Sequence, residues 1–256
     1  MLFMSVLVDL SGRRVLVTGA SSGIGAATCR SIVAQGGSVA MLARRKERLG
    51  ALAEELGDRA VWVACDVTDL ETLDERVTDA ARQLGDLDGV VSVAGAMMTG
   101  TVATGTPQRW RELIELNLLG PLATVRYALP HFSSAGRRDV ILVGSTGALT
   151  PMSGVGIYAA SKRGLEAAFD TLRIELAPQG INVSLVMPGM FDTEGLTMEG
   201  LIMDGDIPPT DTPFFVEGGV PAAPEELADC ITFVMSRPDG ICIHEIVVRP
   251  SGQLNP

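Results

Sequence analysis

The chain has 256 residues, of which 46% are hydrophobic and 20% are charged, and its formal net charge is -11. This composition provides enough apolar side chains for a large core and excludes an intrinsically disordered chain. The acidic balance disfavours nucleic acids and anionic membranes as partners, because both carry negative charge themselves.

The sequence gives no sign of a targeting segment or of paired cysteines. No apolar run reaches the roughly 18 residues that a membrane-spanning helix needs. The N-terminal segment MLFMSVLV lacks the basic start and the small-residue cleavage site of a secretion signal. The four cysteines are scattered, with no C-x-x-C pair and no nearby histidine cluster. We therefore expect a cytoplasmic protein with reduced thiols, no metal site and no membrane partner.

The first recognisable unit is a strand, a glycine-rich turn and a helix. Residues 14–18 have an apolar strand pattern, residues 26–35 are helical in pattern, and residues 38–43 form a second strand pattern. Glycines in such a turn let the backbone approach a pyrophosphate, and the helix N-terminus offers free N–H groups. We therefore expect a dinucleotide site whose candidate residues are Gly19, Ser21, Ser22, Gly23, Ile24 and Gly25.

The end of the second strand indicates which dinucleotide is bound. An acidic residue there would bind the ribose 2′-hydroxyl of NAD. This chain has Ala43 instead, followed by Arg44, Arg45 and Lys46. The planar guanidinium of arginine suits a 2′-phosphate, although these charges could also simply begin an exposed helix. We expect NADP (NADPH) as the cofactor, with Arg44 and Arg45 near its 2′-phosphate.

The rest of the chain continues the alternation of strands and helices. Strand patterns cover residues 60–64, 89–93, 140–143, 181–186 and 245–249, and helical patterns cover residues 68–84, 107–127, 225–236 and a stretch that carries Tyr158 and ends near 176. This order predicts an α/β fold, a single-domain Rossmann-type doubly wound parallel sheet over residues 1–256. Residues 190–224 lose the regular pattern and are expected to form a substrate loop or lid.

A tyrosine and a lysine four residues apart are the candidate chemical groups. Tyr158 and Lys162 should share one helix face, where a nearby ammonium would lower the pKa of the phenol and let it exchange a proton with a carbonyl or alcohol oxygen. Ser145, at a strand end, could hold the same oxygen. The pair could also be an ordinary surface pair. However, the chain has only two lysines against eighteen arginines, so a lysine at this position is informative.

Taken together, these motifs resemble the short-chain dehydrogenase/reductase family. The matching segments, in chain order, are TGASSGIG at 18–25, CDV at 65–67, ELNLLG around Asn117, Ser145, Tyr158 with Lys162, and MPGMFDT at 187–193. The resemblance covers almost the whole chain. It implies reversible, NADP(H)-dependent interconversion of a ketone or aldehyde with an alcohol, in which Tyr158 is the general acid/base and Lys162 also holds the nicotinamide ribose.

The resemblance also implies roles for residues that the patterns alone do not single out. It places Asn117 at a helix irregularity, where it helps to hold a water that links the lysine to solvent. It implies further cofactor contacts at Asp66, Val67, Ala94, Gly95, Pro188, Gly189 and Thr193. The family usually has Asn-Asn before Ala94-Gly95, and this chain has Ser92-Val93 there. A homodimer or homotetramer is expected from the same resemblance.

Two other functions remain open at this point. One is a 3-oxoacyl-carrier-protein reductase, which the negative charge disfavours because carrier proteins are acidic. The other is a non-catalytic NADP-binding sensor, which is consistent with the replacement of the usual Asn-Asn by Ser92-Val93.

The lid composition bears on the substrate. Between Arg173 and Arg237 the chain has eleven acidic residues and no Lys, Arg or His. Its apolar members, which could line the substrate site, are Met190, Phe191, Leu196, Met198, Ile202, Met203, Phe214 and Phe215. The acids could equally be a solvated outer face. Because burying an unpaired anion is costly, we expect a neutral or cationic, largely apolar substrate.

Overall fold

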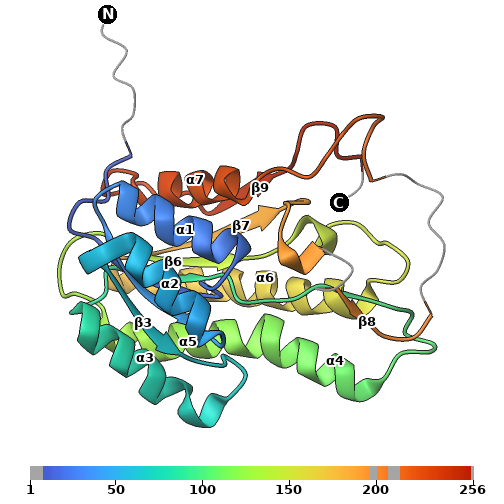
Figure 1. Cartoon of the computed structure of the whole chain (residues 1–256), viewed down its shortest axis with the longest axis horizontal. Coiled ribbons are helices and arrows are strands. Elements are labelled where there is room, and N and C mark those ends of the chain that lie inside the picture. Colours follow the sequence, from blue (N-terminus) through green and yellow to red (C-terminus); the bar gives the residue numbers. More distant parts are fainter. Residues whose placement is uncertain (1–7, 197–200, 207–213, 255–256) are drawn as a thin grey trace, which may run out of the picture.

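Seven short apolar runs form one parallel sheet in the computed structural model, which describes residues 8–196, 201–206 and 214–254. Their spatial order is β3 (Ala60–Ala64), β2 (Ser38–Ala43), β1 (Arg14–Thr18), β4 (Gly89–Ser92), β6 (Arg138–Val143), β7 (Ile181–Pro188) and β9 (Glu245–Val248). Every neighbouring pair of strands in this sheet is parallel. The predicted doubly wound, Rossmann-type fold is confirmed (Figure 1).

Helices cover both faces of the sheet because side chains alternate along each strand. In β1, Val15 and Val17 enter one apolar core and Leu16 enters the other. The first core is closed by α1 (Gly23–Ala34), α2 (Lys46–Leu56) and α7 (Pro224–Met235). The second core is closed by α3 (Leu70–Leu84), α5 (Gly120–Ala128) and α6 (Gly156–Leu176). Both faces are therefore buried, as a parallel sheet requires.

The strand order reverses beside β1, and this reversal creates the crevice for a ligand. The chain first runs outward from β1 to β2 and β3, and then returns to place β4 on the other side of β1. The connections after β1 and β4 therefore run in opposite directions from the carboxyl edge of the sheet, and the crevice lies between them. Their first residues are in contact at the base of the crevice, where a Cβ atom on Gly19 would lie 2.9 Å from the backbone nitrogen of Ala94.

The long helix expected over residues 107–127 is divided into three parts. α4 (Pro107–Ile114) is followed by a π-helical turn, η2 (Glu115–Leu119), and then by α5. Pro121, near the start of α5, has no N–H group to continue the regular hydrogen-bond ladder, which favours a wider turn just before it. The irregularity that the family resemblance implied around Asn117 is therefore this π-helical turn.

A second, two-stranded sheet was not anticipated. β5 (Met98–Thr99) pairs in parallel with β8 (Ile202–Met203). β8 lies within the stretch 190–224, which was expected to be wholly irregular, so that expectation is wrong for these residues. The carboxylate of Asp204 then accepts hydrogen bonds from the backbone N–H of Thr106 at 2.8 Å and from the Trp110 indole at 3.1 Å. These bonds fasten the lid to the start of α4.

The glycine-rich turn gives a first testable prediction. A Cβ atom at Gly25 would overlap the carbonyl oxygen of Gly19, whereas a Cβ atom at Gly50, inside α2, would meet no atom within 4 Å. Gly25→Ala should lower the free energy of unfolding by about 1–3 kcal/mol or more, because the turn must move. Gly50→Ala, the matched control, should raise it by about 0.5–1 kcal/mol through helix propensity. Urea unfolding without added ligand measures both, and equal stability of the two variants would contradict the prediction.

Candidate active site

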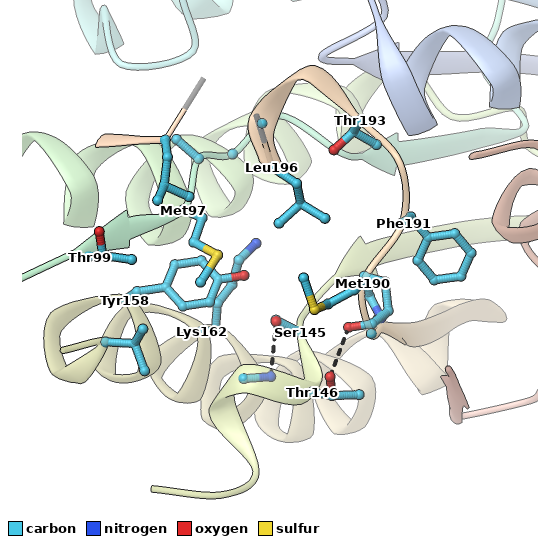
Figure 2. A pocket seen from close by; sticks show the side chains of 18 of the residues that line it. Met97, Thr99, Ser145, Thr146, Tyr158, Lys162, Met190, Phe191, Thr193 and Leu196 are labelled. Atoms are coloured by element: carbon cyan, nitrogen blue, oxygen red, sulfur yellow. Dashed lines mark hydrogen bonds between the residues drawn. The ribbon is translucent and has the colours of Figure 1, made fainter. Parts of the chain in front are cut away.

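A cavity of about 470 Å³ opens at the carboxyl ends of β4, β6 and β7. The cavity is bordered by the glycine-rich turn, by the segment after β4 and by the lid. Ser145, Tyr158 and Lys162 all line it, and Figure 2 shows their polar ends on the same side of the space. The three residues that the sequence singled out are therefore brought together by β6 and α6.

Local packing sets the positions of Ser145 and Tyr158. Ser145 follows β6 and caps the short helical turn η4 (Thr146–Ala148), where its Oγ accepts the N–H of Gly147 at 3.1 Å. Gly147 also lets the Tyr158 ring approach, because a Cβ atom there would lie only 3.2 Å from the ring. Tyr158 lies in the first turn of α6, so its ring projects towards Ser145 (Figure 2).

Lys162 is a buried ammonium held by one backbone carbonyl. Its Nζ donates to the carbonyl oxygen of Val143 at 3.0 Å, and only 6% of the residue is exposed. Burial disfavours the charged form and lowers the pKa of Lys162 to about 8. Almost all other basic residues of the chain are arginines, which stay charged. Lys162, in contrast, can lose its proton near physiological pH.

The pKa of Tyr158 is raised, chiefly because burial disfavours the phenolate, while its hydrogen bond with Ser145 acts in the opposite direction. These two causes do not include Lys162, so the expectation that its ammonium lowers this pKa stays a prediction. A phenol with a raised pKa stays protonated at neutral pH.

Asn117 makes three hydrogen bonds from a completely buried position in the π-helical turn. Its amide nitrogen donates to the carbonyl oxygen of Ala96 at 2.9 Å and to the hydroxyl of Ser161 at 3.1 Å, and its amide oxygen accepts the N–H of Ala96 at 3.0 Å. The side chain therefore joins the segment after β4 to α6. A Cβ atom at Gly95 would lie 3.0 Å from the Asn117 oxygen and 3.4 Å from the Lys162 ammonium, so both groups rest against this glycine.

The altered Ser92-Val93 pair is supported by the strand beside it. The hydroxyl of Thr18, at the end of β1, lies 3.4 Å from the Ser92 hydroxyl and accepts the N–H groups of Val93 and Ala94, each at 3.2 Å. Val93 itself lines the cavity. Thr18 thus braces the end of β4 without the two asparagines that are usual in the family.

The glycine-rich turn fits a dinucleotide phosphate. α1 begins at Gly23, and among the described residues neither a side-chain cap on Ser22 nor an acidic residue occupies its first turn. Its N-terminal amide groups therefore remain available to a phosphate. Ile24 and Thr193 line the neighbouring cavity, and the Thr193 methyl would lie 3.1 Å from a Cβ atom on Gly23. The turn and the residues after β7 thus face each other across the crevice.

The two candidate arginines lie in different environments. The guanidinium of Arg45 faces the turn: Nε donates to the Ser21 hydroxyl at 3.1 Å, and a terminal nitrogen donates to the Ser22 hydroxyl. Arg44 points outward with 76% of its side chain exposed, 3.8 Å from the Asp66 carboxylate. Arg45 is therefore the better placed of the two to contact a phosphate near the turn.

Asp66 and Val67, which follow β3, also differ from each other in exposure. The Asp66 carboxylate is partly exposed and accepts the N–H and the hydroxyl of Thr68 at 3.0 and 2.8 Å. Val67 is buried, and a Cβ atom at Gly120 would lie 3.0 Å from its side chain. Asp66 is open to a ligand at the outer edge of the crevice, and Val67 forms part of the support beneath.

The segment after β7 is tied to the C-terminal end of the chain. The carbonyl oxygen of Pro188 accepts the Thr146 hydroxyl at 3.2 Å, and Gly189 donates its N–H to Val248 at 2.7 Å. A side chain at Gly189 would overlap the side-chain oxygen of Gln253, which also accepts the N–H of Met190 at 2.8 Å. Sequence reasoning missed Gln253, because no local pattern links two residues 63 positions apart.

The cavity lining is mostly apolar. Five of the eight apolar residues predicted for the lid line it, namely Met190, Phe191, Leu196, Met203 and Phe214. Ile202 and Phe215 are not part of this lining, and Met198 lies outside the described residues. Met97, Thr99 and Met152 also line the cavity and were missed. For Met97 and Thr99 the available signal was their position soon after Gly95, in the segment that follows β4.

Two further features are absent from the described ranges. No group of three or more His, Cys, Asp or Glu side chains is placed to hold a metal ion there. In the same part of the chain, no helix is long and apolar enough to cross a membrane.

This fold and this site are those of a dehydrogenase, and comparison with known sequences identifies the family. The family model described as short chain dehydrogenase matches residues 13–200, so the chain belongs to the short-chain dehydrogenase family. It is therefore an oxidoreductase of a family that binds a nicotinamide cofactor.

Individual relatives agree with this assignment. The chain is 32% identical over 249 residues to a glycine betaine reductase of Emericella nidulans, and this match covers 94% of the chain but 19% of that protein's length. An alcohol dehydrogenase from the archaeon Thermococcus sibiricus, solved with 5-hydroxy-NADP, has a TM-score of 0.82 and 26% identity, covering 96% of this chain and 100% of that one. A metagenomic short-chain oxidoreductase solved with NADP has a TM-score of 0.77 and 30% identity, covering 94% and 98%.

The buried ammonium gives a testable linkage between pH and stability. The pKa of Lys162 falls from 10.5 to about 8 on folding, so its charge destabilises the folded state fully below pH 8. This penalty shrinks as the pH rises from 8 towards 10.5 and disappears above 10.5, because the lysine is then neutral in the unfolded form as well. Lys162→Met removes the penalty. Its stability advantage over the wild type should therefore shrink by about 3 kcal/mol between pH 7 and 10.5.

The measurement is urea unfolding of both proteins at several pH values without added ligand. Lys46→Met, the same replacement at an exposed position of α2, is the matched control. A difference between Lys162→Met and the wild type that stays constant across this pH range would contradict the buried-charge account.

Proposed function

We propose that this protein is an NADP(H)-dependent oxidoreductase that interconverts a ketone or aldehyde with an alcohol. The observation that carries the proposal is the convergence of Ser145, Tyr158 and Lys162 on one apolar cavity beside a glycine-rich phosphate cradle. A proton donor, a hydroxyl that can hold an oxygen and a buried cation are the groups that carbonyl reduction requires.

The chain's own residues would handle the oxygen and its proton. NADPH, when bound, would supply the hydride. The phenol of Tyr158 would donate its proton to the carbonyl oxygen in reduction, and the phenolate would take it back in oxidation. The Ser145 hydroxyl would donate a hydrogen bond to the same oxygen. The ammonium of Lys162 would hold the nicotinamide ribose and favour the phenolate left on Tyr158, while Asn117 keeps the segment after β4 and α6 in register.

The preference for NADP over NAD rests on the end of β2. Ala43 supplies no carboxylate for a ribose hydroxyl, and Arg45 is directed at Ser21 and Ser22. Two similar structures bear NADP or a derivative of it, which supports the same choice. We therefore propose that Arg45 is the principal contact of the 2′-phosphate, with Arg44 at the rim of the site.

A neutral or cationic, largely apolar substrate is proposed from the cavity lining. Among the described residues that line the cavity, Lys162 is the only Arg, Lys, His, Asp or Glu. The ammonium of Lys162 already donates a hydrogen bond to the carbonyl oxygen of Val143. Four methionines, Met97, Met152, Met190 and Met203, provide an adaptable apolar wall. An anionic group buried there would lack a free cationic partner.

Self-association is proposed from apolar side chains that are exposed in one copy of the chain. Leu119 of η2 and Ile174 of α6 keep 42% and 65% of their surfaces exposed, as apolar contacts between subunits would require. We propose a homodimer or homotetramer in which these helical segments contact a second copy of the chain. Light scattering that gives the 26.9 kDa mass of one chain would contradict it.

Replacement of the proton donor is the direct test of the chemistry. Tyr158→Phe should lower kcat by about 10²–10⁴-fold, because general acid catalysis by the phenol is lost. NADPH binding, followed by fluorescence, should persist. Tyr127→Phe is the matched control, since Tyr127 packs against the core beneath α5 and should leave turnover unchanged. Turnover that is unaffected by Tyr158→Phe would contradict the mechanism.

A screen of NADPH oxidation with a series of aldehydes and ketones separates the two alternative functions from the proposed one. Tight NADPH binding with no turnover of any aldehyde or ketone would favour a non-catalytic sensor. Turnover restricted to 3-oxoacyl groups on a carrier protein would favour the carrier-protein reductase.

The charge preference of the substrate is tested with one ketone scaffold in three forms, carrying a methyl ester, a carboxylate or an amine. The ester and the amine should have kcat/KM values at least about tenfold above that of the carboxylate, since an unpaired buried anion costs more than 1.4 kcal/mol. Steady-state NADPH oxidation measures all three. A highest kcat/KM for the carboxylate would show that an arginine from elsewhere reaches the cavity.

A further inference from the structure

The carboxylate of Glu194 lies between two arginines at the edge of the cofactor crevice. Glu194 begins the short turn η6 (Glu194–Leu196), which follows β7. One carboxylate oxygen is 2.7 Å from a terminal nitrogen of Arg45, and the other is paired with Arg48. These hydrogen bonds, from Arg45 first and Arg48 second, lower the pKa of Glu194. Glu194 is therefore an anion at neutral pH.

Arg45 bonds this anion and the glycine-rich turn at the same time. Its Nε and one terminal nitrogen donate to Ser21 and Ser22, and its other terminal nitrogen donates to Glu194. The guanidinium proposed to contact a 2′-phosphate thus already holds a carboxylate. A carboxylate and a phosphate oxygen compete for the same kind of donor on a guanidinium.

We propose that Glu194 is a specificity-determining residue that competes with the 2′-phosphate of NADP(H) for Arg45. This inference rests on the proposed use of NADP(H). A nucleotide with a 2′-phosphate must displace Glu194 or share Arg45 with it, and either costs affinity. A nucleotide without this phosphate leaves the Glu194–Arg45 pair intact. Glu194 therefore reduces the discrimination between the two cofactors below what Arg45 alone would give.

The position of Glu194 also connects this competition to the substrate cavity. Its neighbour Thr193 faces Gly23 across the crevice, and both Thr193 and Leu196 line the cavity. When a 2′-phosphate takes Arg45, this segment loses its ion pair with the residue that precedes α2. Binding of a 2′-phosphate at Arg45 would therefore weaken the attachment of the segment that carries Thr193 and Leu196, which form one wall of the cavity.

Calorimetric titration of the full chain with adenosine 2′,5′-bisphosphate and with ADP tests the proposal without turnover. Glu194→Gln should tighten binding of the 2′,5′-bisphosphate about three- to tenfold, the scale of an exposed ion-pair network. Binding of ADP should change less than twofold. Asp192→Asn is the matched control: it removes the same charge two residues away, and the Asp192 carboxylate makes no ion pair or hydrogen bond in the described part of the chain.

Each outcome decides a different question. An unchanged ratio of the two affinities in Glu194→Gln, or a ratio changed equally by Asp192→Asn, overturns the competition. Weaker binding of both nucleotides would show instead that Glu194 stabilises the bound nucleotide, and this result would also overturn the proposed competition. If the wild type does not prefer the 2′,5′-bisphosphate to ADP and Arg45→Ala leaves that binding unchanged, the proposed use of NADP fails, and the inference fails with it.

Discussion

The amide of Asn117 is the contact on which the geometry of the site depends. It joins the segment after β4 to α6, which carries the two groups proposed for proton transfer. A regular helix would turn this residue to a different face, so the π-helical turn is what brings the amide inward. Because the amide is fully buried, any loss of one of its partners leaves an unsatisfied polar group there.

Electrostatics at the site oppose stability. Lys162 is charged and buried against a single carbonyl, and this costs folding free energy that an apolar residue of similar length would not cost. The fold tolerates the cost because both faces of its sheet are covered by continuous apolar cores. Such local destabilisation is common where a protein needs reactive groups.

The fold and the chemical groups could be predicted because their signals are local. Strand and helix patterns alternate, the glycine-rich turn lies between a strand and a helix, and Tyr158 and Lys162 are four residues apart. Features that depend on distant partners could not be predicted. The β5–β8 pair joins residues about a hundred positions apart, and only the folded chain distinguishes Arg45 from Arg44. The pKa of Tyr158 depends on burial, which the sequence does not give.

The last described residues of the chain hold the segment that was expected to form the substrate lid. Besides the bond from Met190 to Gln253, the backbone N–H of Leu254 donates to Phe214, and that of Val216 donates to Gly252. Both the beginning and the end of the lid are therefore fastened to the same few residues. A substitution among residues 250–254 would therefore act on the wall of the cavity, although these residues lie far from Tyr158 and Lys162 in the sequence.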